Sequence, residues 1–183
     1  MLEIFGHAYD SEAERLEVRF AHPEAGRVIR IYRCFAREMY EAVWAEYPET
    51  DVVIMAAAVA DYRPEQTAAQ KIKKGGPQTL ELVANPDILA SLGAEKGGHF
   101  LVGFAAETQR VAEYAAVKLR EKHLDLVIAN DVTAAGAGFD HDTNIVTAFW
   151  PGNGEVASKQ YPLMSKRDAA AEIIQLIAAL MQV

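Results

Sequence analysis

Three lysines stand close together in the middle of an acidic chain. Lys71, Lys73 and Lys74 are followed by Gly75 and Gly76, whereas the whole chain carries a formal net charge of -8. An ammonium group on a glycine-flanked loop can swing toward an anionic ligand and stabilise the negative charge that develops in a reaction. A solvated surface loop explains the same residues without any chemistry. The loop by itself leaves both interpretations open.

A second pair of lysines is spaced for one face of a helix. Lys118 and Lys122 are four residues apart, so both ammonium groups emerge on the same side. Two like charges at this spacing cost about 0.2–0.5 kcal/mol in an isolated helix, and a bound polyphosphate would reverse that cost. Neutralisation by Glu121 and Glu107 is the structural alternative. In a chain that is acidic overall, two such local groups of lysines favour a small phosphorylated ligand over a polymer.

Small residues follow an apolar run. Asp51–Met55 predicts a strand covered on both faces. After it, Ala57 and Ala58 would let a ligand approach the backbone at the carboxyl end of the strand, where open α/β sheets place their sites. Asp61 comes next, and its carboxylate could accept ribose hydroxyls or help to hold a divalent ion. The sequence predicts a ligand site at this edge.

The segment VANPDILASLG predicts the start of a helix. Asn85 suits the N-cap, Pro86 the first helical position, and Asp87 complements the positive end of the helix dipole. Capping alone would explain all three residues. Ligand contact stays open, because this terminus follows the predicted strand Thr79–Val83.

A later acidic cluster gives weak evidence for a metal site. Its members end a predicted strand or lie on a glycine-rich loop: Asn130, Asp131, Asp140, His141, Asp142 and Asn144. The spacing of an EF-hand is missing, and a single histidine among oxygens is poor evidence for a transition metal. No Ser-His-Asp order, Walker loop, GxGxxG or HExxH occurs. We predict no metal ligands from the protein, and the residues alone point to an α/β protein that binds a phosphorylated small molecule.

Strand and helix patterns alternate along the chain. Predicted strands are Arg15–Ala21, Arg27–Arg33, Asp51–Met55, Thr79–Val83, Phe100–Phe104 and Leu124–Ala129, and predicted helices are Phe35–Tyr47, Pro86–Glu95, Thr108–His123 and Lys166–Met181. This alternation predicts an α/β fold: a three-layer, Rossmann-like, mostly parallel sheet. Near the end, Asn144–Trp150 and Glu155–Leu163 flank Asn153-Gly154, a favoured turn pair, and predict a β-hairpin. The last helix is expected to close the sheet.

Length and composition suit one globular domain over residues 1–183. The chain has 183 residues, 51% of them hydrophobic and 24% charged. We find no repeat, linker, signal sequence or membrane-spanning run. We therefore expect a cytoplasmic protein that does not associate with a membrane. The acidic balance argues against nucleic acid and anionic membranes as partners. The single cysteine, Cys34, excludes an internal disulfide.

Taken together, the motifs resemble one family. AAAVADYRP, KIKK, NPDIL, VGFAAET, the lysine pair, DLVIANDV and GFDHDTN occur in the order and near the spacing of bacterial phosphopantothenate–cysteine ligase, also called phosphopantothenoylcysteine synthetase, the C-terminal half of a bifunctional flavoprotein of coenzyme A biosynthesis. They cover the chain from about Ala36 to the C-terminus. Several independent matches in order are far more specific than any one of them.

The resemblance implies an enzyme of pantothenate metabolism. That family joins the carboxylate of 4'-phosphopantothenate to the amine of cysteine through an acyl-cytidylate intermediate, and uses CTP in most bacteria. The implied partners are these small molecules and a second copy of the chain in a homodimer. Mg²⁺ would be carried on the triphosphate of CTP, because it keeps most of its ligands as water and phosphate oxygens. The choice between CTP and ATP stays open.

The resemblance also implies roles for individual residues. Lys71 matches the catalytic lysine that turns over the acyl intermediate, and Lys73, Lys74, Gly75 and Gly76 match a flexible flap. The residues that match nucleotide contacts are Ala57, Ala58, Asp61, Asn85, Asp87, Ile88, Phe104, Lys118 and Lys122. We expect the flap lysines and the helical lysine pair to converge on one polyphosphate at the carboxyl edge of the sheet.

The N-terminus departs from the family. Met1–Gly26 lacks the glycine turn and the asparagine- and serine-glycine-rich segment with which family members begin. A catalytically impaired nucleotide-binding paralogue or fragment is therefore an alternative to a full ligase. An unrelated Rossmann-like oxidoreductase or flavoprotein is a further alternative, although no dinucleotide-binding glycine pattern supports it.

Overall fold

A computed structural model describes residues 4–10, 15–22, 26–28, 35–66, 68–107, 110–131 and 141–181. Its contacts divide the chain into two compact units, and we describe each by itself. Unit 1 comprises Met1–Glu49 and Val59–Asp87, and unit 2 comprises Thr50–Ala58 and Ile88–Val183. The single domain predicted over residues 1–183 stays a prediction.

Unit 2 is built on a five-stranded sheet in the order β11-β10-β8-β7-β4. Its strands are β4 (Val52–Met55), β7 (Phe100–Glu107), β8 (Leu126–Asp131), β10 (Val146–Pro151) and β11 (Val156–Gln160). β4, β7 and β8 are parallel, and β10 is antiparallel to both of its neighbours. All strands except β10 therefore run in one direction. The prediction of a mostly parallel α/β sheet is confirmed.

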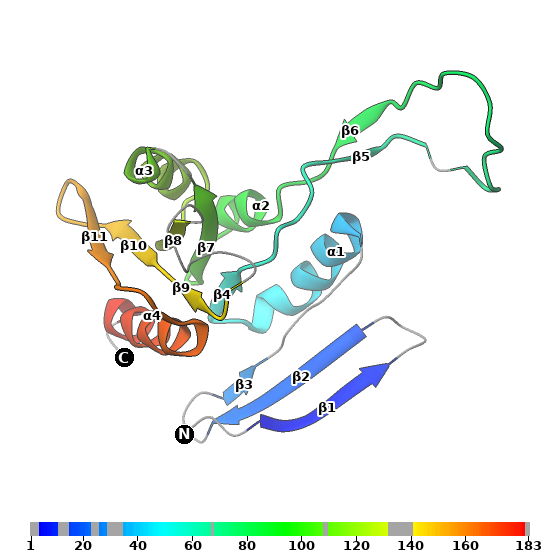
Figure 1. The fold of residues 1–183 in the computed structure, drawn as a ribbon. Coiled ribbons are helices and arrows are strands. Elements are labelled where there is room, and N and C mark those ends of the chain that lie inside the picture. Colours follow the sequence, from blue (N-terminus) through cyan, green and yellow to red (C-terminus); the bar gives the residue numbers. More distant parts are fainter. Residues whose placement is uncertain are drawn as a thin grey trace. The chain divides into compact units, whose positions relative to one another are not determined.

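Helices cover both faces of this sheet (Figure 1). They are α2 (Ile88–Ala94), α3 (Val111–Glu121) and α4 (Lys166–Met181). α4 forms one core with alternate strand residues, since Ile173 and Ile177 pack in a cluster with Val102 and Ile128. On the opposite face α2 lies so close to β7 that a Cβ at Gly103 would stand 2.9 Å from the Leu89 side chain. α3 contacts β8 and β10. The layers are those predicted.

The C-terminal hairpin is confirmed. β10 and β11 pair antiparallel, and the Gly152 N–H donates to the Glu155 carbonyl at 2.8 Å across the turn. Gly154 has φ +90°, a left-handed conformation that costs glycine little. Asn153-Gly154 thus forms the turn that the sequence predicts.

The start of α4 is capped. Ser165 belongs to β12 (Met164–Ser165), which pairs with β9 (Thr143–Asn144). The Asp168 N–H donates to the Ser165 Oγ at 3.1 Å, and the same hydroxyl donates to the Asp168 carboxylate at 2.7 Å. This exchange satisfies a helix N–H that has no partner within the helix and fixes where α4 begins.

Unit 1 begins with a sheet that the sequence did not predict. β1 (Ile4–Asp10), β2 (Arg15–His22) and β3 (Gly26–Val28) pair antiparallel in this order. The predicted strands near Arg15 and Arg27 therefore belong to a separate sheet, not to the parallel one, because strands adjacent in sequence can pair locally. Residues 29–33 of the second prediction lie outside the described residues. α1 (Ala36–Glu46) and η1 (Tyr47–Glu49) follow.

A two-stranded ribbon completes unit 1. β5 (Tyr62–Pro64) pairs antiparallel with β6 (Leu82–Ala84). The predicted strand Thr79–Val83 is thus shorter, begins later and pairs with β5 instead of the main sheet. Pro64 has no N–H to donate and suits such an edge. Among the described residues, none of the helices combines the length and apolar character that crossing a membrane requires.

Candidate functional site

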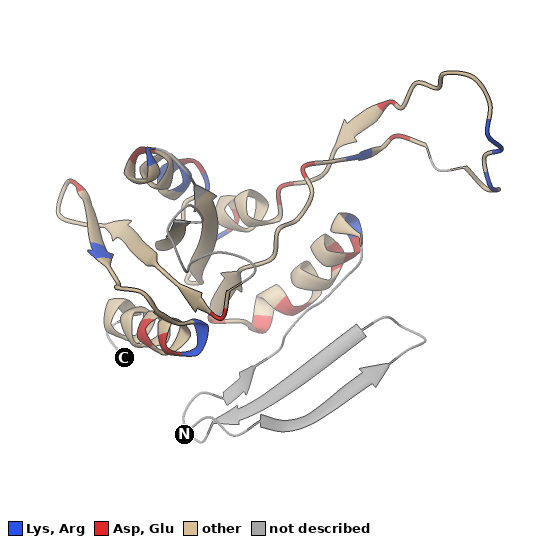
Figure 2. Ribbon diagram, viewed as in Figure 1, with Lys and Arg blue, Asp and Glu red and all other residues tan. Residues whose placement is uncertain are grey.

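The three clustered lysines lie on the loop that joins β5 to β6. Glu65 N–H donates to the Glu81 carbonyl at 2.9 Å, and between these two residues the described part of the loop makes no backbone hydrogen bond. Lys71, Lys73 and Lys74 are exposed. Figure 2 shows basic residues at the far end of this loop from the strands. The described part of this loop, which has no backbone hydrogen bond and no buried side chain, has little to hold it in one conformation, as a flap requires.

Predicted site residues meet at the base of the ribbon. The Asn85 N–H donates to the Asp61 carbonyl at 2.7 Å, and the Asn85 Nδ2 donates to the Ala60 carbonyl at 2.8 Å. Arg63 Nη1 donates to the Ala84 carbonyl at 2.8 Å and to the Asn85 Oδ1 at 3.1 Å. The structure therefore brings Asp61 and Asn85 together, with Arg63, which the sequence did not single out as a site residue.

The predicted helix start is wrong by two residues. α2 begins at Ile88, so Asn85 and Pro86 precede the helix and its cap. The reason is that the Asn85 side chain is engaged by Ala60 and Arg63 across the ribbon. Ile88 is only 3% exposed, and its side chain packs in the interior. A nucleotide contact from Ile88 would have to come from its backbone.

Apolar side chains are exposed near the carboxyl ends of β4 and β7. Phe104 is 38% and Ile54 41% exposed. The register places both on the sheet face of Val102 and Ile128 that α4 covers elsewhere, since Ile54 pairs with Val102 and Phe104 with Ile128. The expectation that β4 is covered on both faces is therefore wrong at Ile54, and within the described residues β4 pairs with β7 on one side alone. Ile54 was not predicted as a candidate contact, because it lies within a continuous apolar run.

The alanines lie in the same unit as this apolar surface. Ala57 and Ala58 follow the end of β4 at Met55, and both are exposed. Because β4 and β7 are parallel, the chain after Met55 leaves the sheet at the edge toward which β7 also runs. Backbone groups and exposed apolar side chains thus occur together at the carboxyl edge, as a site for a planar base requires.

Lys118 and Lys122 are half-buried at the end of α3: Lys118 lies in its last turn, whereas Lys122 follows the last helical residue, Glu121, as the C-cap, so the predicted helix Thr108–His123 ends earlier than expected. They alternate with Ala115 and Leu119, which are 1% and 4% exposed. Such lysines can bury their stems and keep the ammonium group at the surface. Both make interactions in the structure, and Lys118 in the last turn also complements the negative end of the helix dipole.

The direction of α3 constrains what these lysines can reach. The helix runs back from the carboxyl end of β7 toward the start of β8. At about 1.5 Å per residue, Lys118 lies about 10 Å from the start of the helix, and Lys122, just past its end, about 16 Å. A polyphosphate held by both would extend along α3, away from the carboxyl edge. Lys71 belongs to the other unit, and the convergence of both lysine groups on one ligand stays a prediction.

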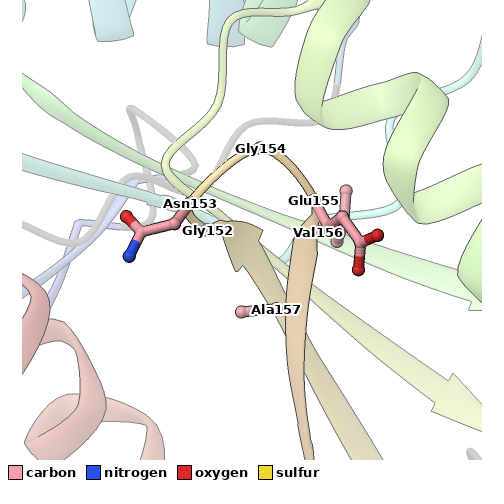
Figure 3. Close-up of a pocket in the computed structure, with 6 residues that line it drawn as sticks. All are labelled: Gly152, Asn153, Gly154, Glu155, Val156 and Ala157. Atoms are coloured by element: carbon pink, nitrogen blue, oxygen red, sulfur yellow. The ribbon is translucent and has the colours of Figure 1, made fainter.

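The concavity drawn in Figure 3 contains none of the predicted site residues. It measures about 440 Å³ and is lined by Gly152, Asn153, Gly154, Glu155, Val156 and Ala157. All of these belong to the β10–β11 turn and its flank, and Glu155 is the only charged one. This lining has no cationic side chain that could bind a polyphosphate.

The acidic cluster supplies no metal centre in the described part of the chain. No group of three His, Cys, Asp or Glu side chains there is placed to hold a metal ion. Asp131 ends β8, and Asp140 lies outside the described residues. His141 and Asp142 are exposed, and the Asp142 carbonyl accepts from the Lys166 N–H at 2.9 Å.

Known proteins resemble most of the chain. The coenzyme A biosynthesis bifunctional protein CoaBC of Bacillus subtilis is 51% identical over 146 residues, which is 79% of this chain and 35% of that protein. CoaBC of Vibrio vulnificus is 46% identical over 163 residues, covering 87% of this chain and 40% of that protein. The chain thus spans little more than a third of the length of these relatives.

Solved structures share the fold. The crystal structure of the C-terminal domain of a CoaBC protein has a TM-score of 0.64 and 38% identity, and the match covers 80% of this chain and 63% of that one. The DNA/pantothenate metabolism flavoprotein from Streptococcus pneumoniae has a TM-score of 0.58 at 20% identity, covering 79% and 70%. The second likeness concerns the fold alone.

The family model describes nearly the whole chain. The model of the DNA/pantothenate metabolism flavoprotein C-terminal domain matches residues 17–181. The match begins upstream of Ala36, where the sequence motifs start, and includes part of the segment that lacks the glycine-rich loop. The chain belongs to the family of the DNA/pantothenate metabolism flavoprotein C-terminal domain.

Proposed function

We propose that this chain is a cytoplasmic ligase domain of coenzyme A biosynthesis, which joins 4'-phosphopantothenate to cysteine at the expense of CTP. The observation that carries the proposal is the 51% identity to a coenzyme A biosynthesis protein over 146 residues. Those residues must include much of the segment 35–181, where the ribbon, the flap loop and α3 lie. The domain architecture and the chemistry of its cationic loop support the same assignment.

The reaction has two steps. A carboxylate oxygen of 4'-phosphopantothenate attacks the α-phosphorus of CTP, which forms an acyl-cytidylate and releases pyrophosphate. The cysteine amine then attacks the acyl carbon and loses a proton. The amide forms as CMP leaves, and CMP keeps the carboxylate oxygen that attacked phosphorus in the first step. Mg²⁺ enters with CTP and neutralises part of the triphosphate charge.

The proposed roles follow the chemistry of each group. The Lys71 ammonium stabilises negative charge on the acyl-cytidylate as it reacts, and the loop, whose described part makes no backbone hydrogen bond, lets it approach and withdraw. Asp61 accepts hydrogen bonds from the ribose, with Asn85 hydrogen-bonded to its backbone, and Asp87 contributes a further contact to the nucleotide. Exposed Phe104, with Ile54, offers an apolar surface to the base, and backbone groups at Ala57 and Ala58 read its edge. Lys118 and Lys122 hold the triphosphate along α3.

The test is pyrophosphate release by the purified chain with 4'-phosphopantothenate, cysteine and CTP. The proposal predicts one pyrophosphate per amide formed, and a burst of about one pyrophosphate per site when cysteine is left out, because the acyl-cytidylate then accumulates. ATP in place of CTP measures the nucleotide preference. Sedimentation of the same sample tests the homodimer that we also propose.

Calorimetry separates the ligase from its alternative. A chain that binds CTP but releases no pyrophosphate with 4'-phosphopantothenate would contradict the ligase and support a nucleotide-binding module. Binding of NADH without CTP would contradict both proposals.

A further inference from the structure

Arg63 occupies the base of the ribbon and serves two strands at once. Its Nη1 donates both to the Ala84 carbonyl and to the Asn85 Oδ1, at 2.8 and 3.1 Å. A terminal guanidinium nitrogen carries two hydrogens, so each acceptor receives one in a fixed planar geometry. The same side chain therefore clamps the backbone of β6 and the side chain that follows it.

The bond to Asn85 determines how that amide is oriented. Because Arg63 can only donate, it holds Oδ1 toward itself and leaves Nδ2 directed at the Ala60 carbonyl, 2.8 Å away. The Asn85 backbone N–H in turn donates to the Asp61 carbonyl at 2.7 Å. Through the Asn85 side chain, Arg63 thus holds the Ala60 carbonyl on one side of Asp61, and the Asn85 backbone holds the Asp61 carbonyl on the other.

The ribbon needs this support. β5 and β6 have three residues each, and a two-stranded ribbon of this length is marginal in water. Beyond Glu65 and Glu81 the described loop makes no backbone hydrogen bond. Motion of the loop would therefore pass directly to Asp61 and Asn85 unless the base of the ribbon were held.

We propose that Arg63 is a positioning residue, which holds Asp61 and Asn85 in the geometry that binds the ribose while the lysine-bearing loop moves. This inference rests on the proposed function for its ligand, but concerns a residue that is not among the proposed nucleotide contacts. Arg63 thus prevents motion of the flap from displacing the residues that contact the nucleotide.

The experiment compares the full chain with Arg63→Met, Arg63→Lys and the control Arg37→Met. Arg37 of α1 is also exposed, and in the described part of the chain its guanidinium pairs with Glu41 at 3.1 Å. We expect Arg63→Met to raise KM for CTP about tenfold, with kcat and KM for cysteine changed less than about twofold. Arg63→Lys should recover part of the loss, to about threefold, because an ammonium reaches one acceptor but lacks the planar fork. Arg37→Met should change nothing.

Hydrogen exchange of the Asn85 backbone N–H, which bonds to the Asp61 carbonyl, gives a readout independent of turnover. It should be about tenfold faster in Arg63→Met, with a melting temperature within about 2 °C of the parent. An unchanged KM for CTP would overturn the inference. So would equal rises in the KM of every substrate together with a large fall in melting temperature, because these indicate a purely structural role. If the parent chain uses no CTP, the proposed function itself has failed, and faster Asn85 exchange would then reveal only a structural clamp.

Discussion

The five-stranded sheet and the β5–β6 ribbon hold their residues by different means. In the sheet, Leu101, Leu126 and Ile128 are 0% exposed and pack between helices on both faces. In the ribbon and its loop, every described residue from 60 to 82 is exposed, and the structure depends on a few hydrogen bonds at the base. Burial fixes the first region, and polar contacts fix the second.

This difference separates stability from function. The candidate catalytic lysine stands on the region without a core, where a substitution removes little buried area. Free energy of folding comes mainly from apolar burial in the sheet. Substitutions in the loop should therefore change turnover without changing the melting temperature, and substitutions of buried residues in the packed helices should do the reverse.

The largest effect is expected from Lys71→Gln. Glutamine keeps a polar side chain, one bond shorter than lysine, but removes the charge, so product formation should fall about 100- to 1000-fold, the usual loss when one stabilising charged donor is removed. CTP affinity by calorimetry should change less than about twofold, and the melting temperature not at all. Lys73→Gln, two residues away and equally exposed, is the control and should cost less than tenfold. Equal loss of binding and turnover in Lys71→Gln would contradict the assigned role.

Removing both helical lysines should weaken binding next most strongly. Lys118→Ala with Lys122→Ala loses two charge-assisted contacts, about 3 kcal/mol or about 100-fold in the Kd for CTP. Arg120→Ala changes an exposed cation of the same turn and should leave the Kd within about threefold. If the Arg120 variant weakens binding as much, general electrostatic attraction explains the effect, and the lysine site is wrong.

Gly93→Ala tests the packed region. A Cβ at this position would lie 2.0 Å from the Lys122 carbonyl oxygen and 2.8 Å from its carbon, and neither backbone atom can move freely. We expect a loss of about 2–3 kcal/mol in the free energy of unfolding and a melting temperature lower by roughly 8 °C. Gly76→Ala, where a Cβ meets nothing within 4 Å, is the control in the loop. A stable Gly93 variant would show that α2 and α3 are not packed as described.

Asp125→Asn should have a smaller effect at the amino edge of the sheet. Its carboxylate accepts from Lys96 Nζ at 2.6 Å and from the Leu101 N–H at 2.7 Å, with both charged side chains 26% exposed. The amide keeps one acceptor but loses the ion pair, which should cost about 1 kcal/mol in urea unfolding. The exposed pair Arg37–Glu41 gives the control: Glu41→Gln should cost less than about 0.5 kcal/mol. Similar losses of unfolding free energy in both variants would show that the partly buried ion pair stabilises the fold no more than the exposed one does.

The sequence predicted the sheet of unit 2 well because its signals are local and strong. β7 and β8 are apolar runs, α3 and α4 carry apolar residues at helical spacing, and Asn153-Gly154 specifies its own turn. The prediction of Ile54 as covered was wrong because an apolar run does not reveal which elements pack over each face of the strand. Exposure depends on neighbours that are distant in sequence.

The ribbon and the N-terminal sheet were harder to predict for the same reason. Thr79–Val83 has strand-forming residues, but which strand it pairs with is a matter of topology. Asn85 has the residue type of an N-cap, yet its side chain bonds to Ala60 and Arg63, a competition that only the fold decides. The lysines and Asp61 were identified by type and spacing, whereas Arg63 became visible only through its two acceptors.

The most direct test of the central claim follows one oxygen atom. The purified chain is incubated with CTP, cysteine and 4'-phosphopantothenate that carries ¹⁸O in its carboxylate, and the CMP released is examined by mass spectrometry. If an acyl-cytidylate forms, one ¹⁸O passes to each CMP, because the carboxylate oxygen that attacked phosphorus leaves with it. Amide formation with unlabelled CMP, or no CMP at all, would contradict the account.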